Sequence, residues 1–556
     1  MIKFDKMQLA GRIEEVAIAL TKNFSIVGTA GEVVVVEQIY EILAKIPYYQ
    51  ENPSDLMFVD VPNDKLGRKN VVCILRGKKG SSKKTVVLNG HLDTVGISDY
   101  GTLAHLANQP YELTEKFKEI VLALPKEAQK DLESGDYLFG RGLLDMKAGI
   151  GIIIALIEAI ANDLENFEGN LVFAGVCDEE ANSAGMTSVV PDLVRIRNEN
   201  NFNYLAFIDT DAITTHYEGD ESKYVFVGSV GKLMPSFFVV GKETHVGEAF
   251  NGIDPNQIAA GIVDRINLNV DFCDVVDGEV TLPPVTLRNR DLKPEYSVQT
   301  AQTTSLFFNY MTQTSTPDEV MKKMIDAAQG AFVQVINRLN KQYERFCCLV
   351  MQSHQPLPWK ARTISYDELY QKVKGELGEE LDALISEFAD EMLKDENIDP
   401  RDFALKQVEF VHKQWSDREP VVVVYYSPPY YPHVHVKGET EIEKNLIRAV
   451  EAAVAEMDTG YQVVYKKFCP YITDLSYATA PTDPGAIAAL KNNTPGFGVK
   501  YDLPLDAMAD LNLPVMDTGP FGKDAHQFTE RMEKTYSFEV APELIYKTID
   551  NLLRGS

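Results

Sequence analysis

Histidines and carboxylates gather in five short motifs of this chain, and the first of them is His91-Leu92-Asp93. It lies directly after the apolar segment 85–88, which is predicted to be a buried strand. A histidine at a strand end can bind a metal ion, and a carboxylate two residues later can accept the proton of its other ring nitrogen. The alternative interpretation is a surface histidine followed by an aspartate in a turn.

Two further motifs place acidic side chains next to a predicted helix or strand. Residues 140–149 (GRGLLDMKAG) put Asp145 where a helix begins, a position at which aspartate also serves as an N-cap. Residues 177–180 (CDEE) follow the predicted strand 170–175 with three adjacent carboxylates. Such carboxylates repel one another, so a bound cation is one reason to gather them, although most charge runs are solvated surface.

The last two motifs are residues 207–211 (FIDTD), with Asp209 and Asp211, and residues 522–530 (GKDAHQFTE), with His526. A pair of turn aspartates and a polar loop are the corresponding structural alternatives. Taken together, the five motifs supply two histidines and at least three carboxylates. This ligand set suits zinc, manganese or cobalt, and it fits a two-metal site in which one carboxylate bridges the ions.

The ordered set His-x-Asp, Gly-x-x-Asp, Asp-Glu-Glu, Asp and Ala-His resembles the M20 metallopeptidases, which include carboxypeptidases, aminoacylases, deacetylases and di- and tripeptidases. More narrowly, the chain resembles the arginine-utilisation proteins of the RocB type, over nearly its whole length. The resemblance implies two divalent metal ions, with zinc favoured over manganese and cobalt. It also implies hydrolysis of an amide or peptide bond in a small peptide or N-acyl amino acid.

The resemblance assigns metal ligation to five residues: His91, Asp145, Glu180, Asp209 and His526. Asp145 would be the bridging carboxylate. His91 and Asp209 would complete the site of one ion, and Glu180 and His526 would complete the site of the other.

Three more residues receive catalytic roles from the resemblance. Glu179 would be the general base, and Asp93 would orient the ring of His91. His245, in the segment 241–245 (GKETH), would help to hold the scissile carbonyl when the inserted domain closes over the site. Closure of this kind would also exclude water.

The chain departs from the family pattern at two positions. Met146 follows Asp145 where some members have a second aspartate, and Asp209 stands where some members use glutamate. Asp211 is a nearby rival of Asp209. We favour Asp209 because it directly ends the predicted strand.

The residue that would bind a substrate carboxylate is not evident from the sequence. Arg288, Arg290 and Arg531 are candidates, although surface salt bridges explain them equally well. Asp474 matches a family aspartate near the site. Residues 364–415 are charged, predicted to be helical and untypical of the wider family.

These motifs require a scaffold of alternating strands and helices, which indicates a mostly parallel sheet with sites at the carboxyl ends of its strands. We expect an α/β fold: a phosphorylase/hydrolase-like mixed sheet in the catalytic domain, with an inserted α+β (βαββαβ) lid domain. The catalytic domain would comprise residues 1–230 and 419–556. The lid would comprise residues 231–418, including a helical insertion at 352–418.

Composition excludes several classes of function. A chain of 556 residues exceeds the roughly 250–300 residues of one core, so several domains are expected. The net charge of −28 argues against binding to nucleic acid or to an anionic membrane surface. The longest apolar run, residues 150–157, is far shorter than a membrane span of roughly 20 residues.

The six cysteines are sparse and lack Cys-x-x-Cys spacing, which is typical of reduced thiols in a cytoplasmic protein. Charged side chains interrupt residues 1–20, so we expect no signal peptide. We expect a small-molecule substrate and consider a homodimer, because some relatives pair through the lid.

Two other functions would be compatible with the metal ligands. A catalytically inactive metal-binding or regulatory member of the same fold would keep the ions but not need the general base Glu179. A structural metal protein would normally use a closed, cysteine-rich site, which this ligand set is not.

Overall fold

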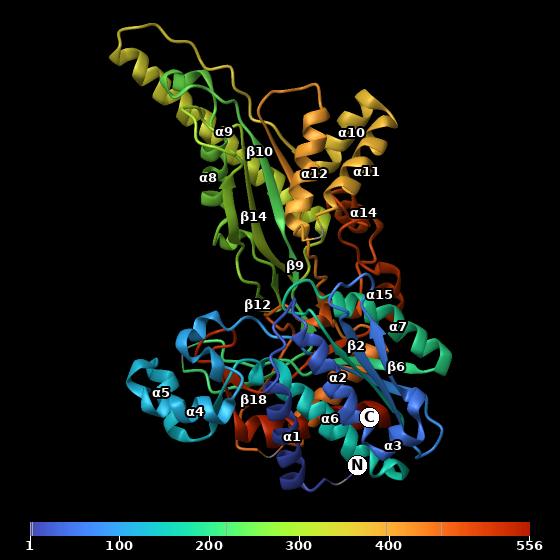
Figure 1. Ribbon diagram of the computed structural model, residues 1–556. Coiled ribbons are helices and arrows are strands. Elements are labelled where there is room, and N and C mark those ends of the chain that lie inside the picture. Colours follow the sequence, from blue (N-terminus) through green and yellow to red (C-terminus); the bar gives the residue numbers. More distant parts are fainter. Residues whose placement is uncertain (1, 3, 218, 396, 458, 556) are drawn as a thin grey trace. The chain divides into compact units, whose positions relative to one another are not determined.

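The computed structural model describes residues 2, 4–217, 219–395, 397–457 and 459–555. The chain forms two compact units, each with its own sheet (Figure 1). The first unit consists of Met1–Ser229, Val434–Ala480 and Pro504–Ser556, and the second of Val230–His433 and Pro481–Leu503.

An eight-stranded mixed sheet organises the first unit. Its strands, in sheet order, are β1 (Leu56–Asp60), β2 (Lys69–Arg76), β5 (Asn170–Val176), β3 (Lys84–His91), β6 (Asn203–Asp209), β19 (Val515–Asp517), β7 (Lys223–Phe226) and β18 (Val463–Lys466). The central strands β5, β3, β6 and β19 run parallel. Their carboxyl ends therefore meet at one edge, where open α/β sheets place their sites.

Helices cover the sheet of the first unit: α1 (Lys6–Thr21), α2 (Gly31–Ala44), α6 (Ala148–Ala161), α7 (Ala184–Asn200), α13 (Glu441–Ala455) and α16 (Ala541–Arg554). Helix α6 is apolar on nearly all sides and buried, so it takes a central position. It packs closely on α1, where a Cβ at Gly151 would lie 3.1 Å from the carbonyl oxygen of Ile13. A larger residue at this position would make the two helices give way slightly.

A small three-stranded sheet joins two of the predicted site motifs. Strand β21 (Arg531–Glu533) pairs with both β20 (Gly522–Lys523) and β4 (Tyr137–Phe139). Strand β4 leads into the segment that carries Asp145, and His526 lies in the turn between β20 and β21. Two segments almost 400 positions apart in the sequence thus reach the same region.

The second unit has the predicted βαββαβ order: β10 (Pro235–Val240), α8 (Pro255–Ile266), β13 (Val285–Asp291), β14 (Thr303–Thr312), α9 (Pro317–Leu349) and β16 (Val421–Tyr426). Its sheet has the order β13-β14-β10-β16-β15, with β15 (Thr363–Ser365) at one edge and β9 (Gly231–Leu233) paired to β14. The prediction of an α/β fold with a mixed-sheet catalytic domain and an α+β lid is confirmed.

The helical insertion forms α10 (Tyr366–Leu377), α11 (Glu380–Met392) and α12 (Pro400–Gln414). Its apolar side chains pack against alternate residues of β10 and β16, namely Phe238, Val240, Val421, Val423 and Tyr425. The residues between them on both strands are buried as well. The insertion thus covers one face of the second unit's sheet, which explains why β16 is a continuous run of valine and tyrosine.

The second domain boundary differs from the expectation that residues 419–556 belong to the catalytic domain. Strand β16 pairs with β10 and β15, so this valine-rich segment completes the sheet of the second unit. The first unit resumes only at Val434, and Pro481–Leu503, which contains helix α14 (Pro484–Asn492), also belongs to the second unit.

Among the described residues, no helix combines the length and apolar character that crossing a membrane would require. All six cysteines are free thiols.

Candidate metal centre

His91 and Asp145 form the first half of the centre. His91 is the last residue of β3 and is buried, and its Nε2 lies 2.9 Å from Asp145 Oδ1. Its Nδ1 lies 3.2 Å from the carbonyl oxygen of Asp93, which can only accept a hydrogen bond. Nδ1 therefore carries a proton, and Nε2 is the ring nitrogen that faces Asp145 and could bind a metal ion.

His526 and Glu180 form the second half. The Nε2 atom of His526 lies 3.0 Å from Glu180 Oε1 and 3.1 Å from Asp145 Oδ2. The two carboxylate oxygens of Asp145 thus face different histidines. One carboxylate shared in this way is the arrangement that bridges two metal ions.

Two groups of candidate ligand atoms result, His91–Asp145–Asp211 and Asp145–Glu180–His526, and within each group the atoms lie within 4.8 Å of one another. Burial and the neighbouring negative charge of Asp145 raise the pKa values of Asp211 and Glu180. Carboxylates packed together at this density repel one another unless cations lie between them. The nitrogen and oxygen donors present therefore fit two divalent cations.

The histidines respond to the same negative charge. Burial opposes protonation of His526, but its bonds to Asp145 and Glu180 raise its pKa to about 11. Burial acts to raise the pKa of Asp145, but the bonds from the two histidines lower it below its ordinary value. Because metal ligation needs neutral imidazole and ionised carboxylate, divalent ions would supply the positive charge that the protonated rings otherwise provide.

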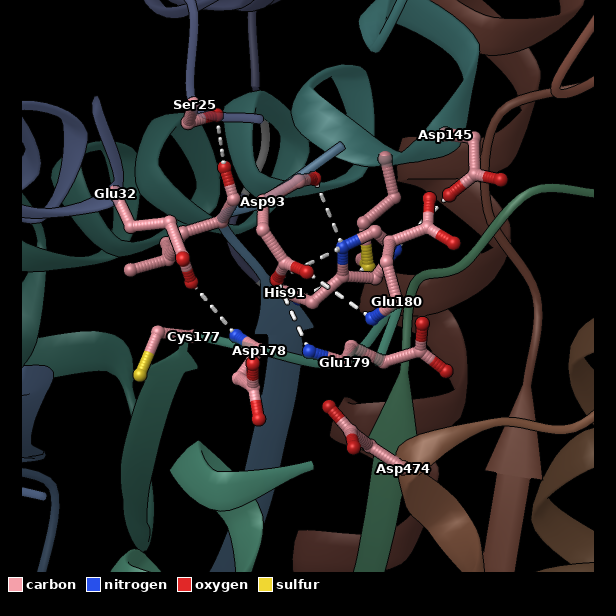
Figure 2. Close-up of polar contacts among 12 residues, drawn as sticks. Ser25, Glu32, His91, Asp93, Asp145, Cys177, Asp178, Glu179, Glu180 and Asp474 are labelled. Atoms are coloured by element: carbon pink, nitrogen blue, oxygen red, sulfur yellow. Dashed lines mark hydrogen bonds and ion pairs between the residues drawn. The ribbon is translucent and has the colours of Figure 1, made fainter. Parts of the chain in front are cut away.

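Glu179 and Glu180 follow β5 on a loop that Asp93 holds. The carboxylate oxygens of Asp93 accept the backbone N–H groups of Glu179 (3.1 Å) and Glu180 (3.0 Å), as Figure 2 shows. The Asp93 carboxylate lies 3.7 Å from His91 Nδ1, farther than the Asp93 carbonyl oxygen. The backbone carbonyl of Asp93, and not its carboxylate as predicted, thus lies nearest to the ring of His91, while the carboxylate fixes the glutamate loop.

Glu179 itself lies in a strongly acidic environment. Burial raises its pKa well above the ordinary value; His91 counteracts this, and the negative charge of Asp474 reinforces it. Figure 2 shows Asp474 on the same side of the loop as Glu179. A carboxyl group with raised proton affinity beside a ligand cluster is suited to accept and return a proton.

Comparison with known proteins identifies the family. Residues 87–498 match the family described as Peptidase family M20/M25/M40. The chain belongs to this family. Its members are metallopeptidases, which accords with a centre built from histidine and carboxylate ligands.

Two relatives match nearly the whole chain. It is 34% identical over 555 residues to Protein RocB of Bacillus subtilis (strain 168), covering 100% of this chain and 97% of that protein. It is 36% identical over 540 residues to Uncharacterized protein YqjN of the same organism, covering 97% and 96%. The resemblance to RocB-type M20 proteins is therefore confirmed.

A solved structure shares the fold. Aminopeptidase PepT from Bacillus cereus ATCC 10987 aligns with a TM-score of 0.52 at 12% identity, covering 98% of each chain.

The geometry favours Asp211 over the expected Asp209 as the carboxylate next to His91 in this M20 chain. Asp211 Oδ1 lies 3.9 Å from His91 Nε2 and belongs to the first ligand group, whereas Asp209 belongs to neither. Asp209 is the last residue of β6 and pairs in register with Asn89 of β3. Its carboxylate accepts the N–H of Thr210 at 2.9 Å. We therefore propose Asp211, which lies beyond the end of β6, as the ligand in place of Asp209.

Substitution of each aspartate separates the two assignments. We expect Asp211→Ala to lower the bound metal from about two ions to about one per chain, because the first group loses a carboxylate. Asp209→Ala should leave about two ions bound. Metal content by mass spectrometry after purification without chelator measures both, and the reverse pattern would restore Asp209 as the ligand.

Glu530 supports both halves of the M20 centre, and the sequence motifs assigned it no role. One of its carboxylate oxygens accepts the N–H of Gly142 at 2.7 Å, the other accepts the N–H of His526 at 3.3 Å, and Arg141 forms an ion pair with it. Gly142 has φ 75°, and a Cβ there would lie 2.3 Å from Thr94 Cγ2. The buried Glu530–Arg141 pair therefore ties the segments of Asp145 and His526 together.

Several predicted residues lie elsewhere. His245 belongs to the second unit, where it is exposed and its Nδ1 accepts the N–H of Gly247 at 3.0 Å. Arg288 and Arg290 both bond to Asp402 of the insertion, at 2.5 and 3.1 Å. The buried Arg531 pairs with Asp131 and Asp524. These contacts account for the three arginines structurally.

Proposed function

We propose that the chain is a two-metal hydrolase that cleaves an amide or peptide bond in a small peptide or an N-acyl amino acid. The observation that carries this proposal is the placement of Asp145 between His91 and His526, at 2.9 and 3.1 Å. Around it, Asp211 and Glu180 complete two ligand groups that share one carboxylate. Two divalent ions held there would lower the pKa of a water molecule and polarise the scissile carbonyl.

The residues around the ligands would perform the proton transfers. Glu179 would accept a proton from the attacking water and return it to the leaving amine. Its backbone N–H is bonded to Asp93, which limits the directions that its carboxylate can take. We propose His245 of the second unit as the donor to the developing oxyanion; its Nδ1 accepts the N–H of Gly247, which leaves Nε2 as its donor nitrogen.

We further propose zinc as the metal, because two imidazoles with carboxylates and no thiolate suit zinc, with manganese and cobalt as alternatives. For the substrate we propose an N-acylated or peptidyl derivative of arginine or a related amino acid. The likeness to RocB-type proteins supports this choice, and the net charge of −28 would attract a cationic substrate.

A metal-reconstitution screen tests the proposed function. The protein, purified without chelator and loaded in turn with zinc, manganese and cobalt, is assayed on dipeptides and N-acyl amino acids, with arginine derivatives beside neutral and acidic ones. We expect about two ions per chain and hydrolysis that prefers the arginine derivatives. Two bound ions without turnover of any substrate would instead favour the non-catalytic, ligand-binding alternative.

A further inference from the structure

The loop that carries Glu179 and Glu180 is held by side chains from three other segments. Its four consecutive backbone N–H groups, from Cys177 onward, each donate to a buried side-chain oxygen. The bonds are Cys177 N to Asn70 Oδ1 (3.2 Å), Asp178 N to Glu32 Oε2 (2.9 Å), Glu179 N to Asp93 Oδ1 (3.1 Å) and Glu180 N to Asp93 Oδ2 (3.0 Å). Figure 2 shows Glu32 and Asp93 on the same side of this loop.

Glu32 is the carboxylate of this set that the metal centre described above does not involve. It lies in the first turn of α2 and is 1% exposed. Its second oxygen accepts the N–H of Gly28 at 2.7 Å, so both carboxylate oxygens bind backbone. A carboxylate buried to this degree needs a cationic partner as well.

Arg68 supplies that positive charge. Its Nη1 lies 3.3 Å from Glu32 Oε1 and 2.5 Å from Asp178 Oδ1. Its Nε and Nη2 donate to Asp64 at 3.0 and 2.8 Å. One guanidinium thus connects α2, the segment before β2 and the first residue of the Asp-Glu-Glu motif, a task that suits its rigid fork of donors.

The loop needs such support because its backbone is strained. Asp178 has φ 66°, a left-handed conformation that is uncommon for residues other than glycine. Its carbonyl oxygen accepts the N–H of Ser183 at 2.7 Å, and its Oδ2 accepts the N–H of Ala184 at 3.1 Å, at the start of α7. Without the bonds to Glu32 and Arg68, the backbone at Asp178 could leave its left-handed conformation, and the side chains of Glu179 and Glu180 would then change direction.

We propose that Glu32 and Arg68 are positioning residues that aim Glu179 and Glu180 into the metal centre. The inference rests on the proposed function in that Glu179 is taken as the base and Glu180 as a ligand. Glu32 and Arg68 do not contact the metal site themselves. Glu32 holds the peptide unit of Asp178, and Arg68 neutralises Glu32 and anchors the side chain of Asp178. Partners of this kind commonly change metal affinity or activity by about 10–100-fold when they are removed.

The first test is Glu32→Gln, which keeps the size of the side chain but replaces one backbone-accepting oxygen with a donor. We expect kcat to fall about 10–100-fold with KM changed less than about twofold. The carboxylates of Glu179 and Glu180 would be displaced, whereas the groups that bind the substrate would not. We also expect zinc removal by a chelator to become biphasic. The ion at Glu180 and His526 should leave at a free zinc concentration about 10–100-fold higher than in the wild type, and the other ion at the wild-type concentration.

Arg68→Lys and Glu37→Gln complete the set. A lysine cannot bridge three carboxylates in a plane, so Arg68→Lys should show the same two changes as Glu32→Gln. Glu37 lies on the same helix α2 but is exposed, and it pairs with Lys69, the neighbour of Arg68, at 2.9 Å. Glu37→Gln should therefore leave kcat, KM and zinc retention at wild-type values.

The zinc measurement needs no substrate and separates this inference from the proposed function. If the wild type binds two ions but turns nothing over, the proposed function fails, while biphasic zinc loss in Glu32→Gln still supports positioning. If Glu32→Gln and Arg68→Lys only lower Tm, and keep kcat and both zinc affinities within about twofold of wild type, the two residues merely stabilise the fold and the inference is overturned.

Discussion

Glu179→Gln is expected to reduce kcat by about 10²- to 10⁴-fold while about two metal ions stay bound per chain. The amide keeps the size of the carboxylate and its backbone bond to Asp93, but it cannot accept the proton of the attacking water. Glu179 belongs to neither ligand group, so its loss as a base leaves the donors of both ions intact. The loss should therefore appear in kcat, with KM nearly unchanged.

The measurement is a steady-state assay of the metal-loaded variant beside metal content on the same sample. Glu180→Gln is the matched comparison, because it changes the next residue on the same loop but removes a ligand that lies 3.0 Å from His526. That variant should lose metal as well as activity. If Glu179→Gln hydrolyses at the wild-type rate, another group is the base; if it loses metal, Glu179 is a ligand.

Most of the fold was predictable because long periodic segments carry it. Strands β3 and β5 and the helices of the insertion appear where the sequence pattern placed them. By contrast, the three-residue strand β19 was not predictable, since Val515–Asp517 is too short to show any periodicity.

The domain boundary illustrates a different limit. A buried central strand is apolar on both faces whichever sheet it joins, so the run of residues 421–424 could not reveal its partners. Its place became evident only from the pairing of β16 with β10. The covering of the second unit's sheet by α10 and α12 likewise depends on contacts between distant segments.

His91 and Glu180 were predictable as neighbours because they follow the parallel strands β3 and β5, whose carboxyl ends lie at the same sheet edge. Asp145 and His526 join them through the separate three-stranded sheet of β20, β21 and β4. Strand direction alone did not distinguish Asp209 from Asp211, because the deciding factor is how far each residue extends beyond β6. Glu32 and Glu530 were not predictable, since the bonds that give them a role go to backbone N–H groups, which have no signal in the sequence.

Asp145→Ala should cause the greatest loss of metal, because it is the only residue common to both ligand groups of the described chain. With the shared carboxylate gone, each ion would lose a donor, and His91 and His526 would lose the anion between them. We expect zinc content to fall from about two ions to near zero per chain at moderate free zinc, and hydrolysis to become undetectable. His526→Ala, which belongs to one group only, should retain about one ion.

Zinc-induced stabilisation gives a readout for Asp145→Ala that does not depend on the substrate. An ion present at 100 times its Kd stabilises the folded state by about 2.7 kcal/mol per site, which appears as a rise in Tm of the wild type. Asp145→Ala should show almost none of this rise, and His526→Ala about half of it. An equal loss of one ion in both variants would mean that Asp145 serves a single ion, and the two-metal arrangement would then have to be replaced by two separate sites.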